Sequence, residues 1–128
     1  TSSTEPYTAT TIATGNDFTC AILNDGNLKC WGENDHGQLG QNNTDDAGAG
    51  DPGITSVASL SPIFLGTGRT AVALATGRDF ACAILDNDSI LCWGSNDNGQ
   101  LGQGDNSGSK VNIGDGSSEM QSLSPVQL

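Results

Sequence analysis

Residues 15–41 read GNDFTCAILNDGNLKCWGENDHGQLGQ, and residues 77–103 read GRDFACAILDNDSILCWGSNDNGQLGQ. The second stretch follows the first at an offset of 62 residues, and their alignment needs no gap. A fixed period of this length is typical of repeat architectures. We therefore predict two tandem repeats, one in residues 1–66 with the N-terminal segment and one in residues 67–128.

Each repeat is expected to form short β-strands joined by turns. Residues 8–13 and 71–75 are rich in β-branched or small residues, and residues 20–23 and 28–31 resemble the two arms of a hairpin. No long stretch has an apolar face with the helical period, so helix content should be low. These patterns predict an all-β fold.

The hairpin turns differ between the two repeats. In the first repeat the turn is Asn24-Asp25-Gly26, and Gly26 can adopt a positive φ at little cost. In the second repeat Asp88 stands at the position of this glycine. Because Asp tolerates the left-handed region better than most residues, we expect Asp88 to adopt it.

Four cysteines flank these two hairpins. A three-residue turn centred on Asp25 places Cys20 opposite Cys30, and the matching turn of the second repeat places Cys82 opposite Cys92. Directly opposed residues of an antiparallel pair can be bridged, so we predict disulfides Cys20–Cys30 and Cys82–Cys92 among three connectivities. A four-cysteine zinc site is disfavoured because the pairs lack the usual short spacing. Disulfides imply an oxidising compartment, so we expect an extracellular or cell-surface protein.

Charge and hydropathy exclude several classes of partner. The chain has 4 Lys and Arg against 15 Asp and Glu, a formal net charge of -11. Phosphate binding needs clustered cations, so we expect no nucleic-acid partner. No apolar run of about 18 residues occurs, so we expect no membrane insertion. The start Thr-Ser-Ser-Thr suggests a processed chain or an excised segment.

Two N-glycosylation sequons are consistent with an extracellular location. They are Asn42-Asn43-Thr44, in the first long polar loop, and Asn87-Asp88-Ser89, at the second hairpin tip. We predict glycosylation at Asn42 and Asn87. The alternative is that both are unused matches to a short pattern.

The acidic loops suggest a metal, whereas nothing indicates catalysis. Asp51, Asp115 and Glu119 are candidate calcium ligands, because calcium prefers several oxygen ligands from flexible loops. The alternative is a pair of solvated acidic loops. No nucleophile stands in an activating motif, and His36 is the single histidine. We therefore expect no enzymatic activity and no certain cofactor.

A recurrent set of residues carries a resemblance to a known family. In the first repeat it comprises Gly15, Ala21, Ile22, Gly26, Trp31, Gly32, Asn34 and the run Gly37-Gln38-Leu39-Gly40. Most of this set recurs in the second repeat, including Trp93-Gly94, Asn96 and residues 99–102. The pattern resembles the repeat of the regulator of chromosome condensation family, and the two-cysteine form resembles its secreted branch.

The resemblance implies a β-propeller with four-stranded blades, usually seven. For this chain it implies two tandem propeller-like blades of antiparallel strands, with Trp31 and Trp93 in the core between blades. Two blades are too few to close a ring, so we expect an open or filamentous assembly. Phe18 and Phe80 depart from the family, which often has His there. Cations are too few to carry over nucleotide exchange or nucleosome binding.

The two ends of the chain match the halves of an internal connection. Residues 126–128 match the stretch before the turn at residues 66–69, and residues 7–11 match the stretch after it. We therefore predict a structural protein whose copies assemble head-to-tail by strand pairing into a filament or matrix. The predicted interface residues are Tyr7, Thr8, Thr10, Ile12, Val126 and Leu128. The alternative is a ligand- or protein-binding fragment of a longer secreted propeller.

Overall fold

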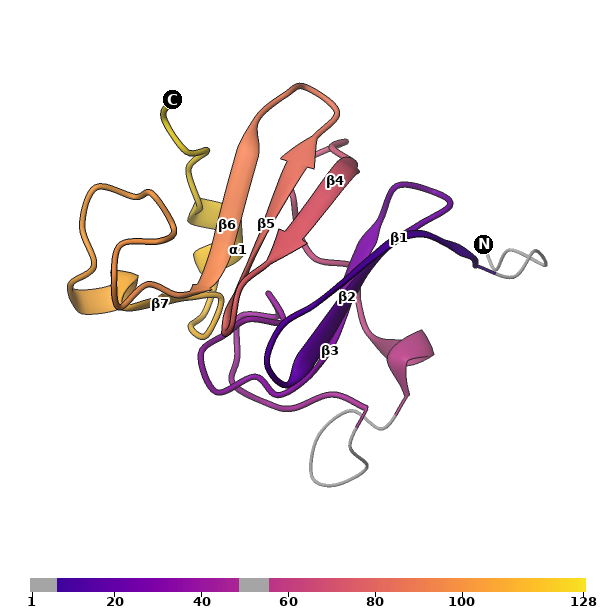
Figure 1. Cartoon of the computed structure of the whole chain (residues 1–128), viewed down its shortest axis with the longest axis horizontal. Coiled ribbons are helices and arrows are strands. Elements are labelled where there is room, and N and C mark those ends of the chain that lie inside the picture. The colour runs from indigo at the N-terminus through magenta and orange to yellow at the C-terminus, as the bar shows by residue number, and fades with distance from the viewer. Residues whose placement is uncertain (1–6, 49–55) are drawn as a thin grey trace.

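The computed structural model describes residues 7–48 and 56–128, which form two antiparallel sheets side by side (Figure 1). The first sheet, blade 1, has the order β1-β2-β3, with β1 at Ala9–Thr14, β2 at Phe18–Leu23 and β3 at Leu28–Gly32. The second sheet, blade 2, has the order β4-β5-β6-β7. Its strands are β4 at Ala71–Thr76, β5 at Phe80–Leu85, β6 at Ile90–Ser95 and β7 at Asn112–Ile113. The all-β prediction is confirmed.

Blade 1 ends in a bridge where blade 2 has a fourth strand. Gly94 pairs with Ile113 of β7, and the equivalent Gly32 pairs with Ala47 in an isolated bridge. The Gly32 N–H donates to the Ala47 carbonyl at 2.9 Å, and the Ala47 N–H donates back at 3.1 Å. Both sheets are therefore built on one four-segment plan.

Helical structure in the described part of the chain is limited to three short turns. They are the 3-10 turns η1 at Val57–Ser59 and η2 at Gly108–Lys110, and the single-turn helix α1 at Glu119–Ser122. None of the described helices has the length and apolar character needed to cross a bilayer.

The hairpins have the predicted register and turns. Cys20 pairs with Cys30 and Cys82 with Cys92 across neighbouring strands, and both pairs form disulfides. The backbone φ is 83° at Gly26 and 68° at Asp88. Asp88 thus takes the left-handed conformation that Gly26 takes in the first hairpin, as predicted.

The connection between the repeats is not a hairpin of two strands. Residues 61–65 form no strand, although residues 71–75 lie in β4 as predicted. Instead the Ile63 N–H donates to the Leu28 carbonyl at 2.9 Å, while Ile63 and Leu65 are buried. The Val126 N–H makes the equivalent bond to the Ile90 carbonyl at 2.9 Å. Residues 126–128 therefore form no strand within the single chain, and their pairing with another copy stays a prediction.

Candidate functional site: the blade junction and the free blade faces

Each blade has two faces, and side-chain alternation assigns residues to them. We call the front face the one that carries the disulfide. It comprises Phe18, Cys20, Ile22, Leu28 and Cys30 in blade 1, and Phe80, Cys82, Ile84, Ile90 and Cys92 in blade 2. We call the opposite side the rear face. It comprises Thr19, Ala21, Leu23, Lys29 and Trp31 in blade 1, and Ala81, Ala83, Leu85, Leu91 and Trp93 in blade 2.

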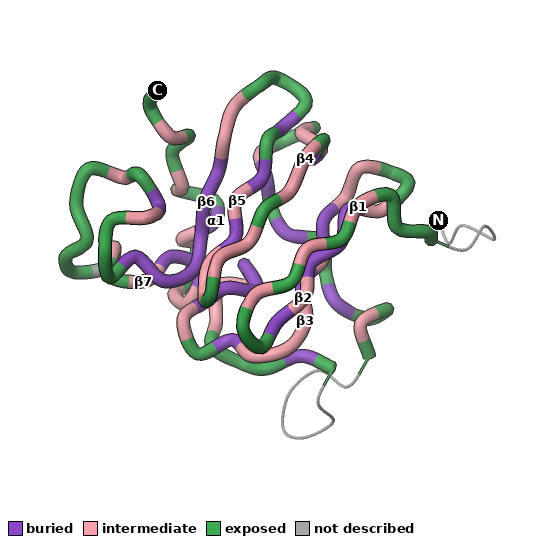
Figure 2. Tube along the Cα trace, in the orientation of Figure 1, coloured by how far each residue is buried: buried purple, intermediate pink, exposed green. Residues whose placement is uncertain are grey.

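The front faces differ in burial. All five front-face residues of blade 1 are at most 3% exposed. In blade 2 only Cys92 is buried, Phe80, Cys82 and Ile90 are half-buried, and Ile84 is 40% exposed. Figure 2 shows β6 mostly buried and β1 and β4 mostly intermediate or exposed. The front face of blade 1 is therefore covered, and that of blade 2 is open.

The rear faces show the reverse pattern. All five rear-face residues of blade 2 are at most 4% exposed. On blade 1 only Ala21 is buried, and Trp31 is half-buried. The junction thus joins the front face of blade 1 to the rear face of blade 2, and the rear of blade 1 and the front of blade 2 are free.

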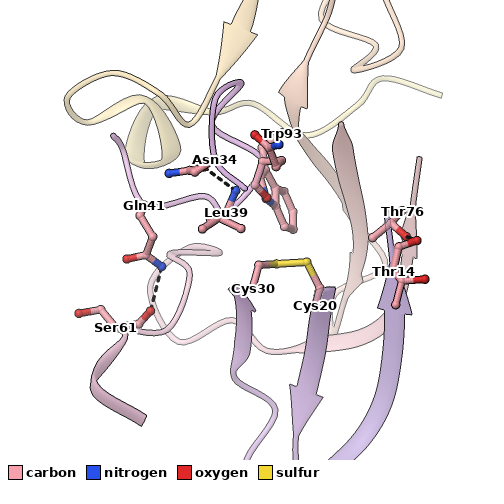
Figure 3. The surroundings of a disulfide bond; sticks show 10 residues. Thr14, Cys20, Cys30, Asn34, Leu39, Gln41, Ser61, Thr76 and Trp93 are labelled. Atoms are coloured by element: carbon pink, nitrogen blue, oxygen red, sulfur yellow. Dashed lines mark hydrogen bonds between the residues drawn. A yellow bond between two sulfur atoms is a disulfide. The ribbon is translucent and has the colours of Figure 1, made fainter. Parts of the chain in front are cut away.

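Trp93 is the centre of the junction. Its ring is fully buried beside Leu39 and the Cys20–Cys30 disulfide (Figure 3). Its Nε1–H donates to the Gln38 carbonyl of blade 1 at 3.0 Å. A buried Trp contributes a large apolar surface and needs a partner for its N–H, and this site supplies both. The prediction that Trp93 lies in the core between blades is confirmed.

Three further hydrogen bonds cross the junction. The Asn16 N–H donates to the Arg78 carbonyl at 2.8 Å, and the Ala71 N–H donates to the Gly26 carbonyl at 3.0 Å. The Thr76 hydroxyl donates to the Thr14 carbonyl at 2.6 Å (Figure 3). These bonds set the position of one blade relative to the other.

A shallow apolar hollow lies on the free front face of blade 2. Its lining is Ala73, Leu74, Ala75, Cys82, Ala83, Ile84 and Ile90. At the equivalent positions of blade 1, Cys20, Ile22 and Leu28 are buried in the core, whereas Ile12 is exposed. The hollow is therefore an apolar part of the surface that blade 1 does not cover.

The predicted assembly residues lie at the surface of the described chain. Tyr7, Ile12 and Leu128 are 59%, 64% and 100% exposed, and Thr8 and Thr10 are also exposed. Val126 is half-buried against Gly102. Their part in an interface stays a prediction.

Sequence reasoning missed the role of two buried asparagines. Asn34 Oδ1 accepts from the Leu39 N–H at 2.9 Å, and Asn96 Oδ1 accepts from the Leu101 N–H at 3.0 Å. Each side-chain amide also donates to loop carbonyls, those of Asn43 and Asp45 in blade 1 and those of Asp105 and Lys110 in blade 2. These residues hold the Gly-Gln-Leu-Gly turn against its long loop, and the recurrence of Asn was the available signal.

The two sequons have different surroundings. Asn87 is exposed at the hairpin tip, and its Oδ1 accepts from the Ser89 N–H at 3.1 Å. Asn42 is half-buried, its Nδ2 donates to Gln121 Oε1 at 2.9 Å, and its Oδ1 accepts from the Met120 N–H at 2.9 Å. Glycosylation at both stays a prediction, and Asn87 is the more accessible acceptor.

The candidate calcium ligands do not gather in one place among the described residues. Glu119 Oε2 accepts from the N–H groups of Gly114, Asp115 and Gly116 at 2.8 to 3.1 Å, so this oxygen already caps a tight turn. Asp115 Oδ2 accepts from Asn112 Nδ2 at 3.2 Å, and Asp51 lies outside the described residues. Calcium binding stays a prediction.

Two carboxyls have altered acidity. The pKa of Asp105 is lowered, first by the N–H of Ser107 and then by Lys110. The pKa of Glu33 is raised, first by burial and then by nearby carboxylates, those of Asp35, Asp17, Asp79 and Asp46. Negative charge is therefore concentrated around Glu33, at the junction.

Solved structures share this arrangement of blades. Yeast RCC1 (Prp20), crystallised with Kap60 bound, has a TM-score of 0.66 and 19% identity, covering 99% of this chain and 24% of that one. Human WBSCR16 has a TM-score of 0.68 and 17% identity, covering 99% of this chain and 27% of that one. These likenesses establish a propeller-blade fold.

Curated relatives are similar over the repeats alone. The protein RCC2 homolog of Danio rerio is 36% identical over 84 residues, 65% of this chain and 15% of that protein. Protein pim1 of Schizosaccharomyces pombe is 28% identical over 104 residues, 80% of this chain and 19% of pim1. The human E3 ubiquitin-protein ligase HERC2 is 29% identical over 100 residues, which are 2% of the ligase. The chain thus spans less than a fifth of these relatives, and no ligase activity follows from the match.

Models of the family cover most of the chain. The regulator of chromosome condensation (RCC1) repeat matches residues 25–84 and 87–128, and a second model of this repeat matches residues 9–38 and 71–100. The match over residues 25–84 begins before β3 and ends in β5, so the family's sequence unit crosses the blade junction. The chain belongs to the regulator of chromosome condensation (RCC1) repeat family, as the resemblance implied.

Proposed function

We propose that this chain is an extracellular structural subunit whose copies pack head-to-tail into a filament or matrix. The free front face of blade 2 in one copy packs on the free rear face of blade 1 in the next. The single observation that carries the proposal is the internal junction, where the same two kinds of face are already joined.

The free faces carry the groups that the internal junction uses. Trp31 stands at the position of Trp93, and Thr14 stands at the position of Thr76. Across a junction between copies, Trp31 Nε1–H would donate to the Gln100 carbonyl, as Trp93 does to that of Gln38. The Ala9 N–H would reach the Asp88 carbonyl, as the Ala71 N–H reaches that of Gly26. Both of these bonds therefore have a counterpart in the chain.

This mode of assembly is face packing and not the addition of a C-terminal strand. The front face of blade 2 leaves a half-buried Ile and Phe partly in contact with water. Burying this surface stabilises the assembly by about 25 cal/mol per Å² of apolar area. A head-to-tail interface that does not close gives a filament. The predicted residues at the chain ends, including Tyr7 and Val126, lie beside this packing.

Ile84→Glu tests the interface. It places a charge in the apolar hollow, so we expect filaments or oligomers to be lost in electron micrographs and by light scattering. Val111→Glu is the matched control, because Val111 is also 40% exposed but lies outside both free faces. Filaments that persist in the Ile84→Glu variant would contradict the proposed interface.

A second candidate function is supported by the finding that the chain covers less than a fifth of each relative. If the next blades lie on the same polypeptide, the chain is a binding fragment of a longer propeller, and the same two faces are covered in cis. The intact mass of the native polypeptide separates the two candidates. That mass also reports glycans on Asn42 and Asn87, and two disulfides are compatible with the extracellular location proposed.

A further inference from the structure

We propose that Glu33, His36 and Asp79 bind a divalent transition-metal cation, of which Zn²⁺ is the test case, across the junction of the two blades. A ligand atom from each of these side chains lies within 4.8 Å of those of the other two. Glu33 and His36 follow β3 in blade 1, whereas Asp79 precedes β5 in blade 2. The site is therefore assembled by the packing of the blades.

The His36 ring has a buried nitrogen that is available for coordination. Its Nδ1 atom is buried and has no hydrogen-bond partner among the described residues. A buried polar atom without a partner costs free energy, and native proteins rarely leave one. Coordination through Nδ1 would satisfy this atom. The His36 backbone is meanwhile held in place, because its N–H donates to Gln38 Oε1 at 2.9 Å.

The two carboxylates have little positive charge around them. Asp79 is mostly buried, its side chain being 16% exposed, and its partner Arg78 is 80% exposed at a distance of 3.3 Å from Nε to Oδ2. Glu33 Oε2 accepts a long hydrogen bond of 3.5 Å from Gln38 Nε2. Exposed ion pairs contribute little to stability, so Arg78 compensates little of the negative charge on Asp79. A divalent cation would neutralise this charge.

The donor set selects the class of metal. One imidazole nitrogen with two carboxylate oxygens suits zinc and its neighbours, whereas calcium prefers six to eight oxygen ligands. Three protein ligands leave a fourth position for water in tetrahedral zinc. Ligand atoms of such a site lie roughly 3.3 Å apart, so small side-chain rotations would close this cluster.

The site is specific to the junction inside the chain. Blade 2 has Ser95 at the position of Glu33 and Asn98 at the position of His36. A junction between copies would bring Asp17, the counterpart of Asp79, opposite these two poor ligands. Metal binding by Glu33, His36 and Asp79 therefore requires no assembly and is expected of a single chain.

The experiment uses the full chain with its disulfides intact, freed of metal by a chelator and titrated with ZnCl₂. We expect one equivalent to bind in calorimetry and to raise the melting temperature. His36→Asn and Glu33→Ser introduce the residues that blade 2 has at these positions. Each should weaken zinc binding at least about tenfold, as loss of a ligand should cost no less than loss of a supporting group.

The matched control is Asp35→Asn, which removes one charge from the same turn but no ligand. Asp35 is exposed, so the zinc binding constant of the Asp35→Asn variant should differ from that of the wild type by less than about threefold. Histidine ring signals in NMR spectra should shift on zinc addition to the wild type and to Asp35→Asn. Absence of binding by the wild-type chain, or equal binding by His36→Asn and Glu33→Ser, would overturn the proposal.

Discussion

Blade 1 and blade 2 have nearly the same sequence and bury opposite faces. Ile22 is 2% exposed and its counterpart Ile84 is 40% exposed, while Trp93 is fully buried and its counterpart Trp31 is half-buried. These two pairs are identical residues, so their difference comes from the neighbour that each blade has. The rear faces also differ in sequence, because Thr19 and Lys29 of blade 1 stand at the positions of Ala81 and Leu91. A blade is therefore not a complete folding unit, as expected of repeats that contact only their neighbours.

The largest effect should come from the two tryptophans. Trp93→Ala empties the centre of the junction and should lower the free energy of unfolding by about 3–5 kcal/mol. Trp31→Ala removes a half-buried ring and should cost roughly half as much in dispersed chains. Urea denaturation of both variants measures the difference. Equal losses would mean that the two rings have the same environment, in conflict with their different burial.

The disulfides offer a second contrast. Both close loops with a sequence separation of 10. Removing either should lower the free energy of unfolding by about 2–3 kcal/mol, because the unfolded chain would no longer be restricted by the crosslink. Cys20 and Cys30 are fully buried, whereas Cys82 is half-buried, so Cys20→Ala with Cys30→Ala should cost more than Cys82→Ala with Cys92→Ala. Thermal unfolding without reductant tests this order. A larger loss in blade 2 would contradict it.

The buried asparagines should behave alike in the two blades. Asn34→Ala and Asn96→Ala each leave buried loop carbonyls and one N–H without a partner, and each should cost about 2 kcal/mol. Faster amide exchange at Leu39 or Leu101 should accompany each loss. Asn106→Ala, at an exposed asparagine, serves as the control. A loss in only one blade would show that the two loops are anchored differently.

The smallest effects should come from the hairpin turns, and they should have opposite signs. Asp88→Gly relieves a left-handed non-glycine residue and should stabilise by about 0.5–1 kcal/mol. Gly26→Ala should destabilise by about 1 kcal/mol or more, because an added Cβ would lie 2.7 Å from Thr70 Cβ. Differential scanning calorimetry can resolve both shifts. The comparison fails if Asp88→Gly is destabilising.

The fold could be predicted far better than the candidate sites. The hairpin register follows from the turn length, and the register in turn places Cys20 opposite Cys30 and Cys82 opposite Cys92. Residues 63–65 form no strand, because the apolar side chains of Ile63 and Leu65 enter the core instead of joining a sheet. The anchoring by Asn34 was missed because its partners Asn43 and Asp45 lie in an irregular loop.

The sequence by itself determined the repeat, the strands, the turns and the two crosslinks, because each depends on residues close together in the chain. Only the tertiary structure decided which copy of each face is covered. It also decided that Glu33 and His36 meet Asp79, since these residues come from different blades. Ile22 and Ile84 are identical residues at equivalent positions, as are Trp31 and Trp93, and their burial depends on whether another blade lies against them.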